Sequence, residues 1–244
     1  MITNLHFENF RGFSELNLSG LKRVNLVVGR NNAGKTSLLE GIVIVTDPKR
    51  IGEMPGLLRA SMGNVEQRYF RWLIRDHEGI DQAKLEVSGP KLKCELVLKR
   101  RFQGEQVHGP KEWGQVFGSS STIVYAPPDI NKIWCRVMSV QHRSPDVMTK
   151  LFAQAVKRKG GEEQIEKLMR SVDDRIQKIR VEPADDGNHI VVDLGLSEML
   201  PLSQVGQGVY RLLAMFAELI GEQPDLCIID EVENGIHHSL LEQV

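Results

Sequence analysis

The sequence predicts an α/β fold that is organised around a glycine-rich loop near its N-terminus. Three observations support this prediction. The loop lies between a short apolar run and a helix-like stretch, a second apolar run ends in two adjacent carboxylates, and strand-like alternation recurs between stretches of helical periodicity. Elements of both kinds along one chain are typical of sheets covered by helices. With 244 residues, 41% of them apolar and 26% charged, the chain can bury one large core or two small ones.

The glycine-rich loop, residues 29–37, reads Gly-Arg-Asn-Asn-Ala-Gly-Lys-Thr-Ser and fits the pattern G-x-x-x-x-G-K-[S/T]. Residues 24–28 before it are predicted to form a buried strand, and residues 37–43 after it are apolar on one face of a helix. The glycines let successive N–H groups converge at the positive end of a helix, which makes a site for phosphate. The pattern arises by chance in roughly one chain in a hundred of this length, and both flanks favour a true phosphate-binding loop.

Two side chains of this loop have expected chemical roles. Lys35 is expected to reach the β- and γ-phosphates of a nucleoside triphosphate and to take part in catalysis. Thr36 is expected to hold Mg²⁺ through its hydroxyl group. The nucleotide-binding residues predicted in the loop are Gly29, Asn31, Asn32, Ala33, Gly34, Lys35, Thr36 and Ser37.

Around this loop, polar and apolar residues alternate over 2–10 and again over 15–19, which predicts two antiparallel strands. The helix after the loop is expected to end at the sequence Thr-Asp-Pro, residues 46–48. Residues 57–75 carry apolar side chains at three- and four-residue spacing, which predicts a helix that faces the core.

In the middle of the chain, residues 84–87 and 91–98 read as a pair of strands joined through Ser-Gly-Pro. Residues 103–121 are rich in glycine and serine and are predicted to be a loop. A further strand is predicted at residues 122–125, before two prolines.

Amphipathic periodicity then predicts helices over residues 147–156 and 162–179. Strands are predicted around residues 179–182 and 189–194, with a turn between them.

A second chemical signal comes late in the sequence. Residues 225–231, Asp-Leu-Cys-Ile-Ile-Asp-Glu, read as a buried strand that ends in two carboxylates. Next to the strand of the glycine-rich loop, this strand is expected to bring Asp230 to Mg²⁺ through water. Glu231 is expected to be catalytic, because it could polarise a water that attacks the γ-phosphate. The alternative is that two acidic residues simply end a strand.

A turn that contains serine and glycine, residues 202–208, precedes a helix predicted at residues 209–220. Such a turn at the N-terminus of a helix is again a site for an anion. Together with the glycine-rich loop, it predicts that residues 1–244 form a single domain. Its nucleotide-binding core has two halves, residues 1–50 and 180–244, with an inserted lobe at residues 51–179.

Four segments resemble the ABC-type ATPase heads of the RecF, SMC and OLD group, and especially the OLD-like ATPases of bacterial anti-phage systems. They are residues 5–13 (Leu-His-Phe-Glu-Asn-Phe-Arg-Gly-Phe), the glycine-rich loop, residues 201–208, and residues 229–237 (Ile-Asp-Glu-Val-Glu-Asn-Gly-Ile-His). The resemblance extends over almost the whole chain. It implies a P-loop NTPase fold with a mixed sheet, an antiparallel β lobe and a helical insertion, and it implies ATP and Mg²⁺ as the cofactors.

The resemblance also implies that ATP is bound between two heads arranged head to tail, as a homo-oligomer. Ser203, Gly206 and Gly208 of one head would contact the γ-phosphate on the other. The turn is one residue longer than the usual L-S-G-G-Q, so the two glycines are the firmer assignment. Arg11 would approach the nucleotide, and residues 233–237 would lie at the interface between heads.

Similar heads continue with a further strand that ends in a switch histidine, whereas this sequence ends at Val244. The C-terminal part of the head is therefore expected to be missing. His237 and His238 lie too early to take that role and are expected at an interface or surface rather than on a metal. No glutamine is clearly placed for the Q-loop, and Gln141 is named for it only as a guess.

The function that the resemblance implies is an ATP-hydrolysing switch. It would control a partner nuclease or other effector in phage defence, supplied by another chain or by a missing C-terminal domain. One alternative is a DNA-repair head that clamps DNA, and another is a nucleotide-bound assembly scaffold with little turnover. Because the net charge is −1, DNA binding would need the basic triplets 99–101 and 157–159. A solvated strand end and a helix C-terminus also explain these triplets.

The cellular compartment is predicted from residue types alone. Cys94, Cys135 and Cys227 are odd in number and form no C-x-x-C pair, which favours a reducing compartment. The sequence begins without a signal-peptide pattern and contains no 18-residue apolar run. We expect a cytoplasmic protein that does not enter the membrane, and a transporter ATPase is disfavoured.

Overall fold

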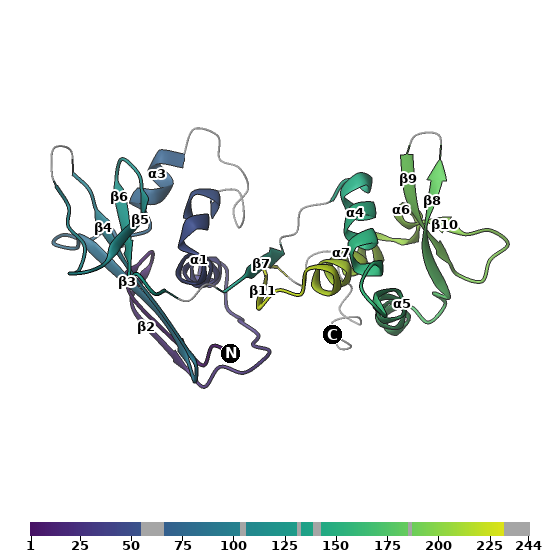
Figure 1. Ribbon diagram of the computed structural model, residues 1–244, viewed down its shortest axis with the longest axis horizontal. Helices are drawn as coiled ribbons and strands as arrows, with labels where there is room; N and C mark the ends of the chain where they lie inside the picture. Colours follow the sequence, from purple (N-terminus) through teal and green to yellow (C-terminus); the bar gives the residue numbers. More distant parts are fainter. Residues whose placement is uncertain (55–65, 103–105, 131–132, 139–142, 185–186, 232–244) are drawn as a thin grey trace. The chain divides into compact units, whose positions relative to one another are not determined.

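A computed structural model of the chain describes residues 1–54, 66–102, 106–130, 133–138, 143–184 and 187–231 (Figure 1). Contacts divide the chain into two compact units, Met1–Val137 and Met138–Val244. Each unit has helices and strands of its own, so the predicted α/β class is confirmed. No helix within the described ranges is long and apolar enough to cross a membrane.

The first unit is built on a six-stranded sheet in which every neighbouring pair is antiparallel. The strand order is β2-β1-β3-β4-β6-β5. The strands are β1 (Asn4–Phe10), β2 (Phe13–Ser19), β3 (Gln82–Gly89), β4 (Leu92–Arg100), β5 (Gly114–Gly118) and β6 (Thr122–Ala126).

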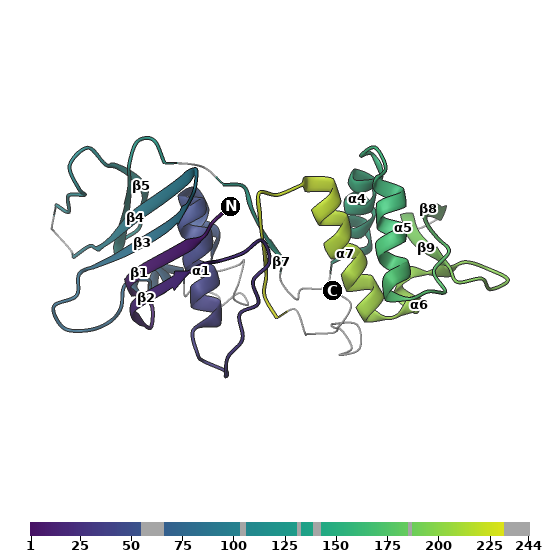
Figure 2. The ribbon, with the colours of Figure 1, turned by 90° about the horizontal axis from the view of Figure 1, so that it is seen from below.

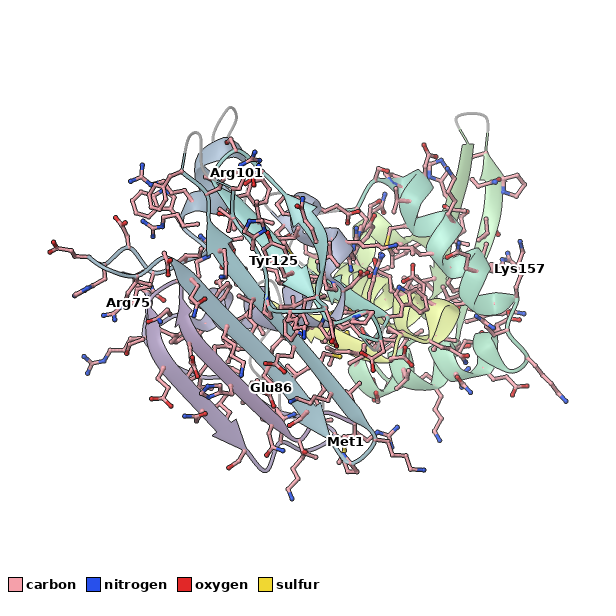
Figure 3. The ribbon with its side chains drawn as sticks, turned by 60° about the vertical axis from the view of Figure 1, so that its left-hand side comes forward. Met1, Arg75, Glu86, Arg101, Tyr125 and Lys157 are labelled. Carbon is pink, nitrogen blue, oxygen red and sulfur yellow. The ribbon has the colours of Figure 1, made fainter. Side chains whose placement is uncertain are left out.

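Alternation of apolar and polar residues gives this sheet one buried and one polar face. On the polar face, Lys84 Nζ lies 3.0 Å from Glu95 Oε1, and Lys93 Nζ lies 3.3 Å from Glu95 Oε2. Glu86 lies on this face too (Figure 3). The buried face is made by Leu5, Phe7, Ala83, Leu85, Val87, Cys94, Leu96 and Leu98.

Helix α1 (Lys35–Thr46) packs on the sheet of the first unit (Figure 1). The closest approach is at Gly41: a Cβ placed there would lie 2.5 Å from Phe7 Cε2 and 3.1 Å from Phe10 Cε1. The helix therefore meets two aromatic rings with its backbone rather than with a side chain. The 3₁₀ helix η1 (Pro48–Glu53) and the short helix α3 (Glu66–Arg71) complete this unit.

Within its described residues, the second unit combines three longer helices and one short helix with a three-stranded antiparallel sheet, in the order β10-β9-β8 (Figures 1 and 2). The helices pack on one another and bury their apolar faces with β8 and β9 in one core. The elements are α4 (Pro145–Val156), α5 (Gly161–Val172), β8 (Lys178–Ala184), β9 (Gly187–Asp193), β10 (Leu200–Pro201), the short α6 (Leu202–Val205), α7 (Gln207–Glu222) and β11 (Leu226–Ile229). Strand β7 (Cys135–Met138) lies where the chain passes from the first unit to the second.

Most predicted elements are present, but three predictions are wrong. Residues 24–28 do not form a strand, because no described segment pairs with them in a β ladder. The side chains of Val24, Leu26 and Val28 are accordingly 85%, 76% and 78% exposed. The segment 103–121 is not all loop, since β5 extends the sheet. The helix predicted to reach Ile179 ends at Val172, where Asp173 has an extended conformation, and Ile179 is buried in β8.

The predicted insertion at residues 51–179 is divided between the two units. Its strands β3, β4, β5 and β6 extend the sheet of β1 and β2, whereas α4 and α5 pack against α7 and β9. Of the helix predicted at residues 57–75, the described part contains α3, and residues 57–65 lie outside the described residues.

The close approach at Gly41 predicts the effect of a single methyl group. Gly41→Ala should destabilise the first unit by about 1–3 kcal/mol, because the added carbon overlaps the ring of Phe7 and the helix must move away from the sheet. Chemical denaturation measures this loss. Gly114→Ala is the matched control, since a Cβ at Gly114 meets nothing within 4 Å. Equal stability of the two variants would contradict the packing.

Candidate nucleotide site

The predicted phosphate-binding loop leads directly into helix α1. Gly34 is the N-cap of α1, with φ 89° and ψ 11°, and no side chain caps this end of the helix. The first helical hydrogen bond runs from the Leu38 N–H to the Gly34 carbonyl, at 2.9 Å. The N–H groups of residues 35–37 therefore precede the helical ladder and point to the space beyond the N-terminus. Such an end attracts an anion.

Gly34 is required by its conformation and by its neighbour. Its φ lies in the left-handed region, which costs a residue with a Cβ about 1–2 kcal/mol. A Cβ at Gly34 would also lie 2.9 Å from Phe13 Cζ. Phe13, the first residue of β2, thus supports the loop from one side.

Lys35 lies over the loop that precedes it. Its ammonium donates to the carbonyl oxygens of Gly29, at 2.7 Å, and Arg30, at 3.1 Å. The cation is therefore held beside the N-terminus of α1, in a position to contact a phosphate bound there. Thr36 follows in the first turn of the helix, and its side chain is half-buried.

Arg11 lies in the turn between β1 and β2, and its side chain contacts Glu40 of α1. Its Nε is 3.0 Å from Glu40 Oε2, and its Nη2 donates to Glu40 Oε1 at 3.1 Å. Glu40 is fully buried, and the Arg11 side chain is only 10% exposed. The residue expected to approach the nucleotide is thus bound to the helix that begins at the loop.

The predicted anion turn of the second unit, residues 202–208, is mostly helical, because Ser203 lies in α6 and Gly208 in α7. Gly206, with φ 121° and ψ 150°, separates the two helices in a conformation that favours glycine. Ser203 and Gly206 are exposed, and Gly208 is half-buried in the first turn of α7. No side chain caps the N-terminus of α7, so this helix end also presents N–H groups.

The two predicted carboxylates follow β11. The Asp230 N–H donates to the Met138 carbonyl at 3.1 Å, which fixes the end of the strand. Glu231 is exposed and has φ 52°, a left-handed conformation that is uncommon for a residue with a Cβ. Its carbonyl accepts a hydrogen bond from Arg211 Nη2 of α7 at 2.9 Å. The carboxylate turn and α7 are thereby connected.

The donor set fits a nucleoside triphosphate with Mg²⁺. The first unit offers backbone N–H groups, an ammonium and a hydroxyl group at one helix end. The second unit offers carboxylate oxygens, which together with a hydroxyl are ligands that Mg²⁺ prefers. The phosphate-binding loop, Thr36 and Arg11 belong to the first unit, whereas Ser203, Gly206, Gly208, Asp230 and Glu231 belong to the second. Their assembly into one site stays a prediction.

Three contributors were not identified from the sequence: Glu40, Tyr69 and Arg211. Glu40 carried a signal, since it is the one charged residue in the apolar stretch 38–45. A lone carboxylate there indicates a buried group that needs a partner. The predictions for Gln141, residues 233–237, His237 and His238 lie outside the described residues.

Comparison with known proteins agrees with this geometry. Residues 1–98 match the family model described as an AAA ATPase domain. The DNA replication and repair protein RecF of Bacillus cytotoxicus is 22% identical over 134 residues, and RecF of Bacillus cereus is 24% identical over 135 residues. These alignments cover 54% of this chain and about a third of each RecF protein. An uncharacterized protein of Methanocaldococcus jannaschii is 43% identical over 49 residues, 20% of this chain and 22% of that protein.

Two solved structures resemble the whole chain. An SMC head bound to the C-winged helix domain of ScpA has a TM-score of 0.58 at 11% identity, over 99% of this chain and 84% of the head. The recombination mediator protein RecF, in its ATPrS form, has a TM-score of 0.51 at 10% identity, over 100% of this chain and 90% of that chain. The fold of the chain is therefore similar to that of the SMC head and of RecF.

The left-handed turn at Gly34 gives a prediction that needs no ligand. Gly34→Ala should lower the free energy of unfolding by at least about 1–2 kcal/mol, because alanine must adopt a positive φ. Replacing Phe13 by leucine in the Gly34→Ala protein should restore only the part of the lost stability that comes from the clash with the Phe13 ring, because the cost of the positive φ remains. Thermal denaturation of the single and double variants measures both parts. A Gly34→Ala protein as stable as the wild type would contradict the geometry of the loop.

Proposed function

We propose that the chain binds ATP with Mg²⁺ and hydrolyses it, as a switch whose heads associate when ATP is bound. The observation that carries this proposal is the loop at residues 29–37. It combines the left-handed Gly34, the uncapped N-terminus of α1 and the Lys35 ammonium at one place. The match to an AAA ATPase domain covers this loop and supports the same conclusion.

In this proposal each unit supplies one half of the chemistry. In the first, the N–H groups and Lys35 bind the β- and γ-phosphates, and the Thr36 hydroxyl is one ligand of Mg²⁺. In the second, Asp230 holds the ion through water and Glu231 orients the attacking water. Mg²⁺, when bound, neutralises the phosphate charge that develops during transfer. The hydrogen bond from Arg211 holds the backbone of Glu231 in its exposed, left-handed position.

Association is proposed to be head to tail. Ser203 and Gly206 are exposed and Gly208 is half-buried near the N-terminus of α7, where an uncapped helix end would attract the γ-phosphate of ATP on a second head. The SMC head of the solved structure is bound by ScpA, which supports a partner protein for this chain too. We infer from the resemblance to OLD-like ATPases that this partner is a nuclease or other effector of phage defence, acting in the cytoplasm.

The decisive experiment is the native mass of Glu231→Gln with and without ATP and Mg²⁺. This variant should bind ATP but not hydrolyse it, because it keeps the shape of the side chain and loses the base. We expect a larger species only when ATP is present, measured by light scattering after size exclusion. Lys35→Ala is the control, since it should lose ATP binding, and therefore the mass shift, without loss of fold.

Each other outcome contradicts part of the proposal. ATP affinity retained in Lys35→Ala would remove the loop from nucleotide binding. Normal turnover in Glu231→Gln would remove Glu231 from catalysis. A monomer in both conditions would contradict ATP-dependent association, and an assembly that ATP does not change would indicate a scaffold.

A second candidate function is DNA binding, supported by a basic and aromatic surface of the first unit. This end patch consists of Arg71, Trp72, Arg75, Arg101 and Phe102. Trp72 and Phe102 are 47% and 51% exposed, and the Arg71 guanidinium lies 5.7 Å from the Trp72 ring. Exposed rings beside arginines suit the bases and phosphates of single-stranded nucleic acid.

Backbone contacts bring these residues to one end of the sheet. The Arg75 N–H donates to the Asn9 carbonyl and the Arg101 N–H to the Ser121 carbonyl. Figure 3 shows Arg75 and Arg101 at the end of the sheet opposite to Met1. The similarity to RecF, a DNA replication and repair protein, supports the same candidate.

In both basic triplets the central arginine makes contacts within its own unit. Arg100 Nη1 is 3.3 Å from Asp76 Oδ1, and Arg158 donates twice to the Gly221 carbonyl at the C-terminus of α7, at 3.0 and 3.1 Å. Lys157, next to Arg158, is exposed at the C-terminus of α4 (Figure 3). A hollow of about 540 Å³ beside Arg100 and Phe102 is lined by residues 76–81, three of which are acidic. Because these acidic residues would repel phosphate, DNA would contact the arginines of the end patch rather than the hollow.

The DNA candidate predicts a change in salt dependence. Replacing Arg71 and Arg101 together by alanine should lower the slope of log Kd against log salt by roughly two, one unit for each phosphate contact. Fluorescence anisotropy with a single-stranded oligonucleotide measures the slope. Lys157→Ala/Lys159→Ala removes the same charge from the second unit and should leave the slope unchanged. Equal effects of the two pairs would show that only overall charge matters.

A further inference from the structure

A buried polar cluster connects α1 to two other segments of the first unit. It contains Arg11 from the turn after β1, Glu40 from α1, and Tyr69 from α3. The Tyr69 hydroxyl donates to Glu40 Oε1 at 3.0 Å, and Arg11 Cζ lies 4.4 Å from the centre of the Tyr69 ring. Arg11 and Glu40 are 29 residues apart in the sequence, and so are Glu40 and Tyr69. The chemistry proposed above assigns no role to Glu40 or Tyr69.

An ion pair between Arg11 and Glu40 holds the cluster together. Glu40 is 0% exposed and receives two contacts from the Arg11 guanidinium, so a buried carboxylate faces a buried cation in two-point geometry. Arg11 also donates from Nη1 to the Trp72 carbonyl, at 3.4 Å. Burial, and then the charge of Glu40, raise the pKa of Tyr69, so its hydroxyl stays protonated and acts as a donor. A buried ion pair of this kind is costly to break from one side.

The position of Glu40 on α1 gives the cluster a mechanical consequence. Glu40 comes five residues after Lys35, which is about 7.5 Å along the helix axis. The next residue, Gly41, lies against Phe7 and Phe10. The sheet therefore sets the distance of α1 at Gly41, while the ion pair at Glu40 opposes rotation and sliding of the same turn. Both contacts act on the helix whose N-terminus forms the phosphate site.

We propose that Glu40 is a positioning residue of the nucleotide site, which acts through Arg11 and Tyr69 to hold α1, and with it Lys35 and Thr36, in the geometry that accepts a triphosphate. The left-handed φ of 54° at Arg11 fits this role, because an unfavourable backbone conformation persists where side-chain contacts hold it. This inference rests on the proposed binding of ATP. This role differs from a direct contact between Arg11 and the nucleotide, because the residue that determines nucleotide affinity is Glu40, which is buried on α1.

The test is the ATP affinity of Glu40→Gln, measured by calorimetry. Glutamine keeps the size of the side chain and removes its charge, so the loop must be ordered when the nucleotide binds rather than beforehand. We expect the Kd for ATP to rise about tenfold, as loss of preorganisation weakens binding. In turnover assays KM should rise while kcat changes little, because the groups proposed to act on the attacking water remain. Tyr69→Phe, which deletes one hydroxyl group and preserves the packing of the ring, should raise Kd by a smaller factor in the same direction.

A matched variant separates positioning from general loss of stability. Val124→Ala creates a cavity at β6, where Val124 is 0% exposed and is paired with Leu98 and Phe117 of the neighbouring strands. It should lower the melting temperature without raising the Kd of the folded protein. If Glu40→Gln binds ATP as tightly as the wild type, or if Val124→Ala weakens binding equally, the positioning role is wrong. If Glu40→Gln does not fold, an unchanged Kd in Tyr69→Phe is the result that overturns it. Failure of the wild type itself to bind ATP would instead overturn the proposed function.

Discussion

The packing of α1 on the sheet of the first unit is the constraint on which the candidate site depends. In the first unit, the backbone N–H groups, Lys35 and Thr36 that are proposed to bind phosphate and Mg²⁺ all lie on this helix or on the loop before it. The helix can approach the sheet closely because Gly41 presents no side chain to Phe7 and Phe10. Phe13 from the neighbouring strand then supports Gly34 at the helix end. The proposed phosphate site is thus positioned by ordinary apolar contacts, whose loss would move the site without removing any of its functional groups.

A second principle recurs in both units: a buried carboxylate on the principal helix is paired with an arginine from another segment. On α1, Glu40 pairs with Arg11. On α7, Glu218 is 2% exposed, and Arg143 Nη2 lies 2.6 Å from its Oε1. Apolar packing lets a helix slide or turn at small cost, whereas an ion pair in a dry environment has one favoured geometry. These pairs therefore specify the position of helices whose N-termini carry the proposed anion sites.

The sequence predicted local structure better than packing between distant segments, for a physical reason. The phosphate-binding loop depends on the conformations of neighbouring residues, so its glycines and lysine were recognisable from local pattern alone. Strands β1 to β4 were recognisable because one face of each is buried and the other is not. Strand β5 was missed because its glycines hide the alternation. The partners of Glu40 could not be found, because they depend on contacts between residues far apart in the chain.

Residues 24–28 show most clearly where local pattern stops being sufficient. Their valines and leucine favour a strand, yet Val24, Leu26 and Val28 are exposed and no ladder is assigned to them. A strand is stable only when a neighbouring segment satisfies its N–H and C=O groups, so residue preference alone cannot form one. The loop that follows keeps its geometry all the same, because Gly34, Phe13 and α1 determine it. The proposed anion site of the first unit therefore depends on the helix and its support on the antiparallel sheet, and this support does not require the preceding segment to be a strand.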